Sequence, residues 1–216
     1  MRNDAFTERL ERAPDAGLAL IARAAAALRD DRPLPAEEVS GALLETETPC
    51  ALSAGAADAA LDRIDRLESL DGRGDAAPRR AARDLGELLA LPDPVREAAF
   101  DSILEGAHWG FAGFGIRRLS LDMPGEGKVD LLRIEPGAGV AMHDHEDEEY
   151  TLVLTGAFHD GHELYRPGDI NVAMPGFRHE PKALPGEVCF ALAVSYGSPA
   201  FEGPVGLLQR LTGFGR

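Results

Sequence analysis

The chain has little positive charge. Its 216 residues carry 22 Lys and Arg against 37 Asp and Glu, which gives a net charge of −15, and the only lysines are Lys128 and Lys182. Binding nucleic acid through its phosphates requires a basic patch, so this composition argues against a nucleic-acid partner. A basic protein partner is favoured instead, although the same charge also serves solubility.

Cysteines and long apolar runs are scarce as well. Cys50 and Cys189 lie far apart in the sequence and indicate no disulfide framework. No apolar run approaches the ~20 residues that a membrane span needs, and the first residues lack the apolar stretch of a signal peptide. We therefore expect a cytoplasmic protein without a membrane partner.

The character of the sequence changes near His108. Before it, alanine, leucine and acidic residues favour helices at 16–30, 35–45, 53–70, 78–91 and 93–104. After it, short β-rich runs separated by glycine and proline turns follow at 114–121, 129–134, 150–156, 170–174 and 188–196. This order predicts an α+β protein, with a helical domain at 1–72, a helical linker at 73–107 and a β-barrel at 108–216.

Three histidines and a glutamate form the most informative pattern. His143 and His145 are two residues apart, so on an extended strand they point to the same side. Glu149 keeps the same parity, and His179 follows a glycine-rich turn and a further strand. Three imidazoles and a carboxylate inside a barrel suit zinc, iron, manganese or nickel.

This segment resembles cupin motif 1 at every position. Gly137 is followed by five residues, the HxH pair, three residues, the glutamate, six residues and Gly156. Residues 168–183 resemble motif 2 less closely, because Met174 stands where proline is usual and Ala183 where asparagine is often found. The resemblance implies an RmlC-like jelly-roll barrel that binds one divalent metal ion through His143, His145, Glu149 and His179.

A narrower resemblance extends over nearly the whole chain. Residues 41–65 are similar to the linker and helix of ChrR-type cupin anti-sigma factors, and 143–158, 165–169, 178–181 and 189–194 are similar to the cupin of that family. In such proteins the N-terminal helices hold an extracytoplasmic-function (ECF) sigma factor inactive, and the metal cupin is needed for its release under oxidative stress. The resemblance implies an ECF sigma factor as partner, and Cys189 as the redox candidate.

The N-terminal half departs from that family in one respect. The family carries a zinc motif, H-x3-C-x2-C, in its helices, whereas here no histidine precedes His108 and Cys50 is the only cysteine of that half. A zinc site of that type therefore cannot form. Either the helices fold through packing alone, or sigma binding has been lost.

Two functions from different classes remain open. A regulator would use the four ligands as a closed tetrahedral zinc site, structural or sensory in role. A metal-dependent cupin dioxygenase or isomerase, acting on a small organic molecule, would use iron or manganese with open positions, and Glu149 could then act as base. The helical half favours the regulator, although it could also be a homodimerisation arm, and the missing zinc motif favours the enzyme. No catalytic residue is identified.

Other chemically capable side chains have simpler interpretations. His159 and His162 flank a turn and are expected to be exposed. Cys189 lies in an apolar run, where burial makes a thiol inert more often than reactive. Four acidic residues are expected to form a solvated rim around the metal site: Asp144, Glu146, Asp147 and Glu148.

Overall fold

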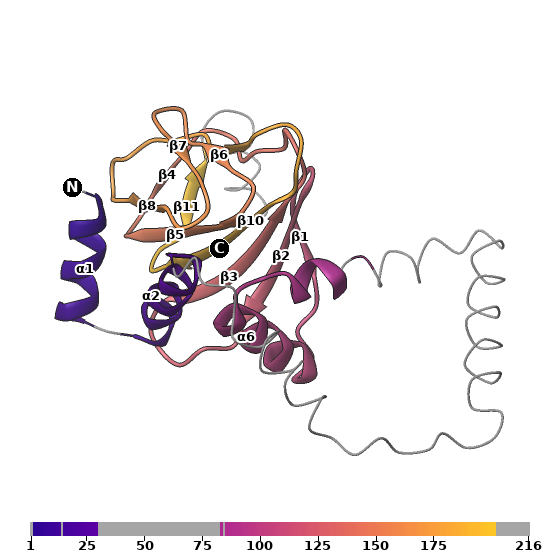
Figure 1. The fold of residues 1–216 in the computed structure, drawn as a ribbon. Helices are drawn as coiled ribbons and strands as arrows, with labels where there is room; N and C mark the ends of the chain where they lie inside the picture. The colour runs from indigo at the N-terminus through magenta and orange to yellow at the C-terminus, as the bar shows by residue number, and fades with distance from the viewer. Residues whose placement is uncertain (1, 14, 30–82, 84, 202–216) are drawn as a thin grey trace, which may run out of the picture. The chain divides into compact units, whose positions relative to one another are not determined.

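The computed structural model describes residues 2–13, 15–29, 83 and 85–201. The helices lead the chain and the strands follow, which confirms the predicted α+β class (Figure 1). The named helices are α1 (Arg2–Arg12), α2 (Ala16–Arg29) and α6 (Asp93–Leu104). The strands are β1 (Gly110–Gly113), β2 (Ile116–Leu121), β3 (Lys128–Ile134), β4 (His143–His145), β5 (Glu149–Thr155), β6 (Phe158–His159), β7 (Leu164–Tyr165), β8 (Ile170–Ala173), β9 (Lys182–Ala183), β10 (Cys189–Ser195) and β11 (Pro199–Phe201).

The strands form one large sheet and two small ones. The large sheet has the order β1-β2-β3-β10-β5-β8, and the small sheets are β11-β4 and β7-β6-β9. Every pairing among these strands is antiparallel. Strand β10 lies between β3 and β5, with an unbroken register against β3 and a register shift between Phe190 and Ala191 against β5. This is the two-layered antiparallel barrel that the β-rich runs predicted, and β3, β5, β8 and β10 lie within two residues of their expected positions.

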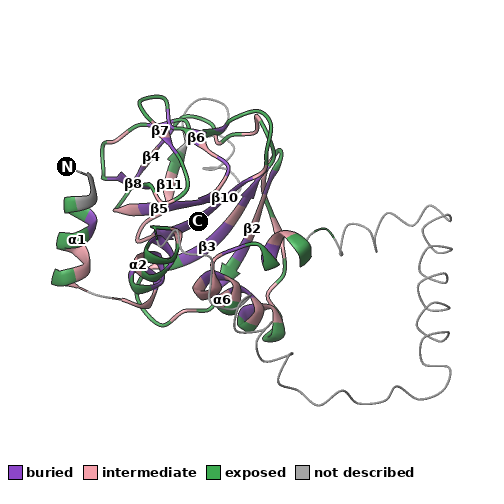
Figure 2. Ribbon diagram, in the orientation of Figure 1, coloured by how far each residue is buried: buried purple, intermediate pink, exposed green. Residues whose placement is uncertain are grey.

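The core depends on β10, which is buried from Cys189 to Val194 (Figure 2). Successive side chains of a strand point to opposite faces of the sheet. Ala191 and Ala193 therefore face the barrel interior, where they line a cavity. Leu192 and Val194 face the other side, and both are fully buried. A central strand covered on both faces accounts for the unbroken apolar run in the sequence.

The outer face of the large sheet is covered by helices. Helix α2 contacts β5, β10 and α6, and α6 contacts β2. The buried side of α2 consists of Gly17, Leu18, Leu20, Ile21, Ala24 and Ala25. Burying one leucine or isoleucine contributes roughly 1.5–3 kcal/mol, so this face stabilises α2 by packing, with no metal needed. This supports, for α2, the possibility that the N-terminal helices fold through packing alone.

The chain separates into two compact units. One unit comprises residues 1–30 together with 91–216, and the other comprises 31–90. The first two helices therefore belong to the same unit as the barrel, whereas the sequence placed them in a domain ending at 72; that domain division stays a prediction. The helices expected at 35–45 and 53–70, and Cys50, lie outside the described residues. Of the stretch 78–91, residues 83 and 85–89 are helical.

Candidate metal centre

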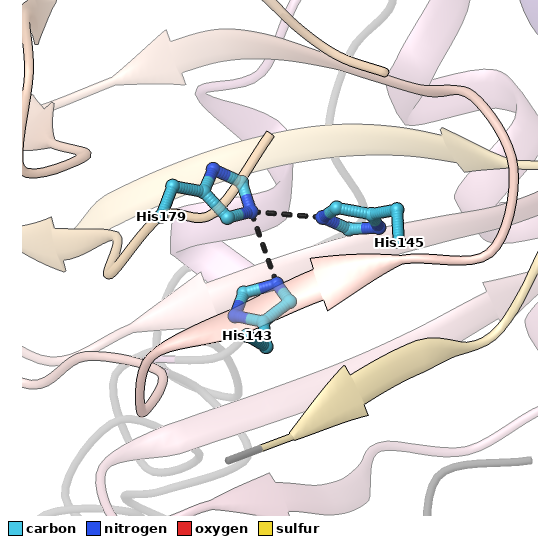
Figure 3. A group of neighbouring side chains, drawn as sticks. All are labelled: His143, His145 and His179. Carbon is cyan, nitrogen blue, oxygen red and sulfur yellow. Dashed lines mark hydrogen bonds between the residues drawn. The ribbon is translucent and has the colours of Figure 1, made fainter. Parts of the chain in front are cut away.

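Three histidine side chains meet inside the barrel (Figure 3). Nε2 of His179 lies 2.8 Å from Nε2 of His145 and 3.0 Å from Nε2 of His143. All three residues are buried, with exposed fractions of 2–5%. They form a cluster whose ligand atoms all lie within 4.8 Å of one another. The structure thus brings together the three histidines that the motifs selected.

The backbone holds two of these residues directly against each other. His143 donates its N–H to the carbonyl of His179 at 3.0 Å, and His179 donates in return at 3.0 Å. This isolated bridge joins β4 to the turn that follows β8. The side chain of Asp144 adds a second link, because its Oδ1 accepts the N–H of His145 at 2.7 Å and that of Gly176 at 2.8 Å. Both motif segments are therefore fixed by main-chain contacts.

The rings are prepared to act as neutral ligands. Nδ1 of His143 lies 2.9 Å from the carbonyl of Ala141, and donation there leaves the Nε2 lone pair directed at the cluster. Burial lowers the pKa of His143, and the neighbouring His145 lowers it further. Burial, followed by the charges of His143 and His145, lowers the pKa of His179 to about 4. Uncharged imidazole is the form that binds a metal.

Glu149 lies beside the cluster. Its Oε2 is 3.9 Å from Nδ1 of His145, the ring nitrogen opposite the cluster. The same oxygen accepts a hydrogen bond from Ser195 at 2.8 Å, and Oε1 accepts one from Thr151 at 3.3 Å. Glu149 therefore faces the barrel interior as expected, although it is not a member of the three-histidine cluster. Its role as the fourth ligand stays a prediction.

The residues present fit a metal ion. Two nitrogens bound to one tetrahedral zinc ion at about 2.0–2.1 Å lie about 3.3 Å apart, and the Nε2–Nε2 distances of 2.8 and 3.0 Å are close to that spacing. Three buried imidazoles would repel one another if protonated, and neutral rings sharing one cation avoid that repulsion. The cluster is therefore suited to one ion held by three nitrogens, with a carboxylate close by.

The acidic rim is only partly as predicted. Glu146 and Asp147 are exposed, in agreement with a solvated rim. The prediction is wrong for Glu148, which has an ion pair with Arg9 of α1 at 3.0 Å and accepts a hydrogen bond from Tyr150 at 3.0 Å. Glu148 could not be assigned this role from the sequence, because its partner Arg9 lies on α1, far away along the chain. Asp144, described above, is likewise a structural link and not a rim residue.

The remaining histidines are exposed, as the hairpin prediction required. His159 and His162 both lie at the surface, and Nε2 of His162 is 3.0 Å from the carbonyl of Arg178. Neither residue belongs to the cluster of metal-ligating groups found among the described residues.

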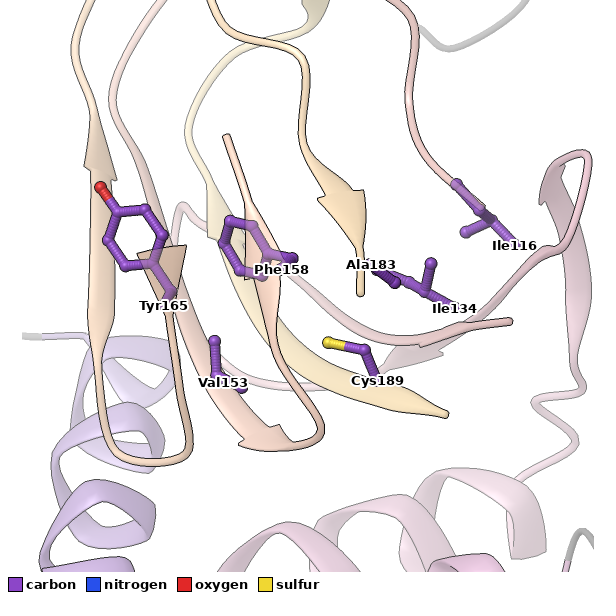
Figure 4. Packing of buried hydrophobic residues seen from close by; sticks show 7 residues of the cluster. All are labelled: Ile116, Ile134, Val153, Phe158, Tyr165, Ala183 and Cys189. Atoms are coloured by element: carbon purple, nitrogen blue, oxygen red, sulfur yellow. The ribbon is translucent and has the colours of Figure 1, made fainter. Parts of the chain in front are cut away.

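Cys189 lies in an apolar cluster away from solvent (Figure 4). The cluster consists of Ile116, Ile134, Val153, Phe158, Tyr165, Ala183 and Cys189 itself. Burial raises the pKa of the thiol to about 12, and the charge of Glu187 adds to the effect. The reactive thiolate is therefore disfavoured in the folded protein, which agrees with an inert side chain.

The antiparallel barrel, with an HxH pair and a third histidine meeting inside it, defines a cupin. Residues 104–197 match the family model described as the ChrR cupin-like domain. The anti-sigma-E factor ChrR of Cereibacter sphaeroides is 32% identical over 159 residues, which are 74% of this chain and 70% of that protein. The chain belongs to the ChrR family.

A solved structure agrees with this assignment. A chain in the crystal structure of Rhodobacter sphaeroides SigE in complex with the anti-sigma ChrR matches with a TM-score of 0.54 and 28% identity, over 89% of this chain and 95% of that chain. An RmlC-like cupin protein of Ralstonia eutropha has a TM-score of 0.41 and 15% identity, over 51% of this chain and 82% of its own. No helix in the described part of the chain is long and apolar enough to cross a membrane.

Proposed function

We propose that this chain is an anti-sigma factor that binds an ECF sigma factor and carries one divalent metal ion in its cupin barrel. The observation that carries the proposal is the extent of the similarity to ChrR. It spans 159 residues by sequence and 89% of the chain by structure, whereas the cupin match alone covers 104–197. The likeness therefore includes helical sequence outside the barrel, which a cupin enzyme does not need.

The metal is proposed to be zinc, bound by His143, His145, His179 and Glu149. Three imidazoles and one carboxylate supply the four ligands of a tetrahedral site. Glu149 would have to turn from its contacts with Ser195 and Thr151 toward the Nε2 atoms. A closed site of this kind has no open position for a substrate, which suits a structural or sensory ion.

The sigma factor is proposed to bind through the N-terminal part of the chain. The net charge of −15 favours a basic partner surface. The missing N-terminal zinc motif does not exclude this, because the buried face of α2 is held by packing. Under this proposal the metal cupin reads the signal, with oxidative stress as the expected one.

The test is a capture of the tagged full-length protein from its own host at native expression, with bound proteins identified by mass spectrometry. Metal content is measured on the same samples by inductively coupled plasma mass spectrometry. Three forms are compared: wild type, His145→Ala, and His159→Ala as a matched exposed control. We expect a stoichiometric sigma factor with the wild type and one zinc per chain in the wild type and the control.

The two halves of the proposal fail separately. A wild-type capture without any sigma factor would refute the anti-sigma function. A wild type without stoichiometric metal, or a His145→Ala variant with undiminished metal, would refute the metal site.

A further inference from the structure

The contact surface between the first helix and the barrel includes a methionine. Helix α1 lies beside β8 and contacts it (Figure 1). A pocket of about 170 Å³ lies between the two, with Arg9 and Arg12 of α1 on one side and Tyr150 and Met174 of the barrel on the other. Met174 directly follows β8, so it lies where the helix meets the end of this strand.

Met174 is the apolar, accessible member of this surface. Its barrel neighbours interact through polar groups, since Glu148 pairs with Arg9 and accepts a hydrogen bond from Tyr150. Met174 contributes a thioether, a flexible apolar group that adapts to irregular contacts. The carbonyl of Met174 accepts the N–H of Phe177 at 2.9 Å, so a turn fixes its backbone. With 43% of the residue exposed, reagents in solvent reach a side chain that also belongs to the docking surface of α1.

The other sulfur atoms of the described residues lie in different settings. Cys189 is buried with a raised pKa, so it offers little of the reactive thiolate. A thioether has no proton to lose, and its oxidation therefore depends on exposure. Met142 is 36% exposed, close to the value for Met174, but it does not line the pocket under α1. Met174 thus combines exposure with a place in a contact between two segments.

Oxidation of Met174 would place a polar oxygen in this contact. A sulfoxide converts the apolar side chain into a strongly polar one, which disrupts surfaces that pack through methionine. The guanidinium groups of Arg9 and Arg12 already face the carboxylate of Glu148, at 3.0 and 3.8 Å. An ionised carboxylate is a stronger acceptor for these cations than a neutral sulfoxide oxygen. The new oxygen therefore keeps its water, and the apolar contact with α1 is lost.

We propose that Met174 is an oxidation site, and that its conversion to the sulfoxide by a hydroperoxide weakens the docking of α1 on the barrel. The thioether sulfur donates an electron pair to the terminal oxygen of the hydroperoxide. An S–O bond forms as the O–O bond breaks, the hydroxyl proton passes to the departing oxygen, and water or an alcohol leaves. Met174 loses two electrons and the hydroperoxide gains them. The inference goes beyond the proposed function, because it requires neither the sigma factor nor the ion.

The test is limited trypsin digestion of the full-length protein before and after treatment with hydrogen peroxide. Mass spectrometry identifies the released peptides and the sulfoxides. Trypsin cleaves after Arg9 and Arg12, and cleavage within a helix requires local unfolding, so its rate reports the undocked population of α1. We expect a sulfoxide at Met174 and cleavage at these two sites about fourfold faster than in untreated protein, the effect of losing about one buried methylene group.

Three variants assign the effect to one side chain. Met174→Leu keeps the apolar volume but cannot form a sulfoxide, so peroxide is expected to leave its cleavage rate unchanged. Met174→Gln introduces a polar side chain of similar length, and we expect faster cleavage without any peroxide. Met142→Leu is the matched control at a similarly exposed methionine, and it is expected to respond to peroxide like the wild type.

Distinct outcomes would overturn the inference. Peroxide that oxidises Met142 and leaves Met174 unmodified would do so, as would complete Met174 sulfoxide with an unchanged cleavage rate. Equal acceleration in Met174→Leu would also overturn it, because the effect would then come from another group. Metal content, measured on the same samples, shows whether that group is the metal centre. No sigma factor is added, so a failure of the proposed anti-sigma function leaves this result unaffected.

Discussion

Arg9 of the first helix and Glu148, the residue before Glu149, form an ion pair with a distance of 3.0 Å between Nε and Oε2. The guanidinium of Arg9 also lies 4.5 Å from the centre of the Tyr196 ring. Both side chains of the pair are largely buried, with exposed fractions of 16% and 17%. The first helix is thereby attached to the start of β5, next to the proposed metal centre.

The strength of this attachment can be measured with a double-mutant cycle of Arg9→Gln and Glu148→Gln. We expect each single change to lower the free energy of unfolding, with a coupling of about 1 kcal/mol between them. The matched control is Arg12→Gln, whose guanidinium lies 3.8 Å from the same carboxylate but is 63% exposed. Urea unfolding gives the free energies. Strictly additive effects of the two changes would show that the pair contributes nothing.

Asp144 is predicted to position the metal ligands through main-chain contacts. Asp144→Ala removes the acceptor shared by the N–H groups of His145 and Gly176, and we expect metal affinity to fall by about tenfold. Asp144→Asn keeps an oxygen in place and should recover most of the affinity. Glu146→Ala is the exposed control. Competition with a chromophoric chelator measures the affinities, and equal values for the alanine and asparagine variants would contradict a positioning role.

Gly17 permits the close approach of α2 to the sheet. A Cβ added there would lie 2.7 Å from Cγ2 of Val129 and 3.1 Å from Cγ2 of Val194. We expect Gly17→Ala to destabilise the protein by about 1–3 kcal/mol through overpacking. Gly86 is a matched helical control with nothing within 4 Å of its added Cβ, so Gly86→Ala should be neutral or stabilising by up to about 1 kcal/mol. Thermal unfolding of the two variants distinguishes them, and equal effects would disprove the close contact.

Cys189 is predicted to resist thiol reagents in the folded protein. Its pKa is raised to about 12 by burial, against 9.0 for an ordinary thiol. Iodoacetamide at pH 8 should therefore label it only after unfolding, as read by peptide mass spectrometry. Because the folded pKa is the higher one, its contribution to stability is complete below pH 9 and decreases as the pH rises toward 12. Rapid labelling under native conditions would restore Cys189 as a redox sensor.

Local patterns in the sequence predicted the barrel well. The run 188–196 was identified as a strand because it is apolar throughout, and the structure places it at the centre of the large sheet. Helix α6 occupies the residues expected for it, where a proline and an acidic residue mark the first turn. His143 and His145 were found because a spacing of two residues follows strand geometry, and His179 because it follows a glycine-rich turn and a further strand in a segment that resembles cupin motif 2.

Glu149 shows where such reasoning is incomplete. Its inward direction was inferred from parity with His143 along one strand, but β4 ends at His145 and Glu149 begins β5, in a different sheet. It faces inward because it is paired with Ser195 of β10. The predicted inward orientation of Glu149 is therefore correct, but the single continuous strand from which it was inferred does not exist.

Contacts between distant segments could not be predicted. The partners of Glu148 and Tyr196 lie on or next to α1, since Arg9 pairs with the first and Asp15 accepts a hydrogen bond from the second. Such pairs depend on where the helix packs against the barrel, and the hydrophobic periodicity of a helix does not specify that position. The cavity lined by Ala191 and Ala193 could not be predicted either, because the sequence does not show whether a side chain from another segment fills the space beside them.

The paired backbone hydrogen bonds between His143 and His179 have a consequence for what remains of the site when the proposed ion is removed. They join main-chain atoms of β4 and of the turn after β8, so the barrel itself holds the two segments together. In small zinc domains the ion and the fold are gained or lost together. Here removal of the proposed ion is expected to leave the backbone pairing in place, because neither hydrogen bond uses a side-chain atom.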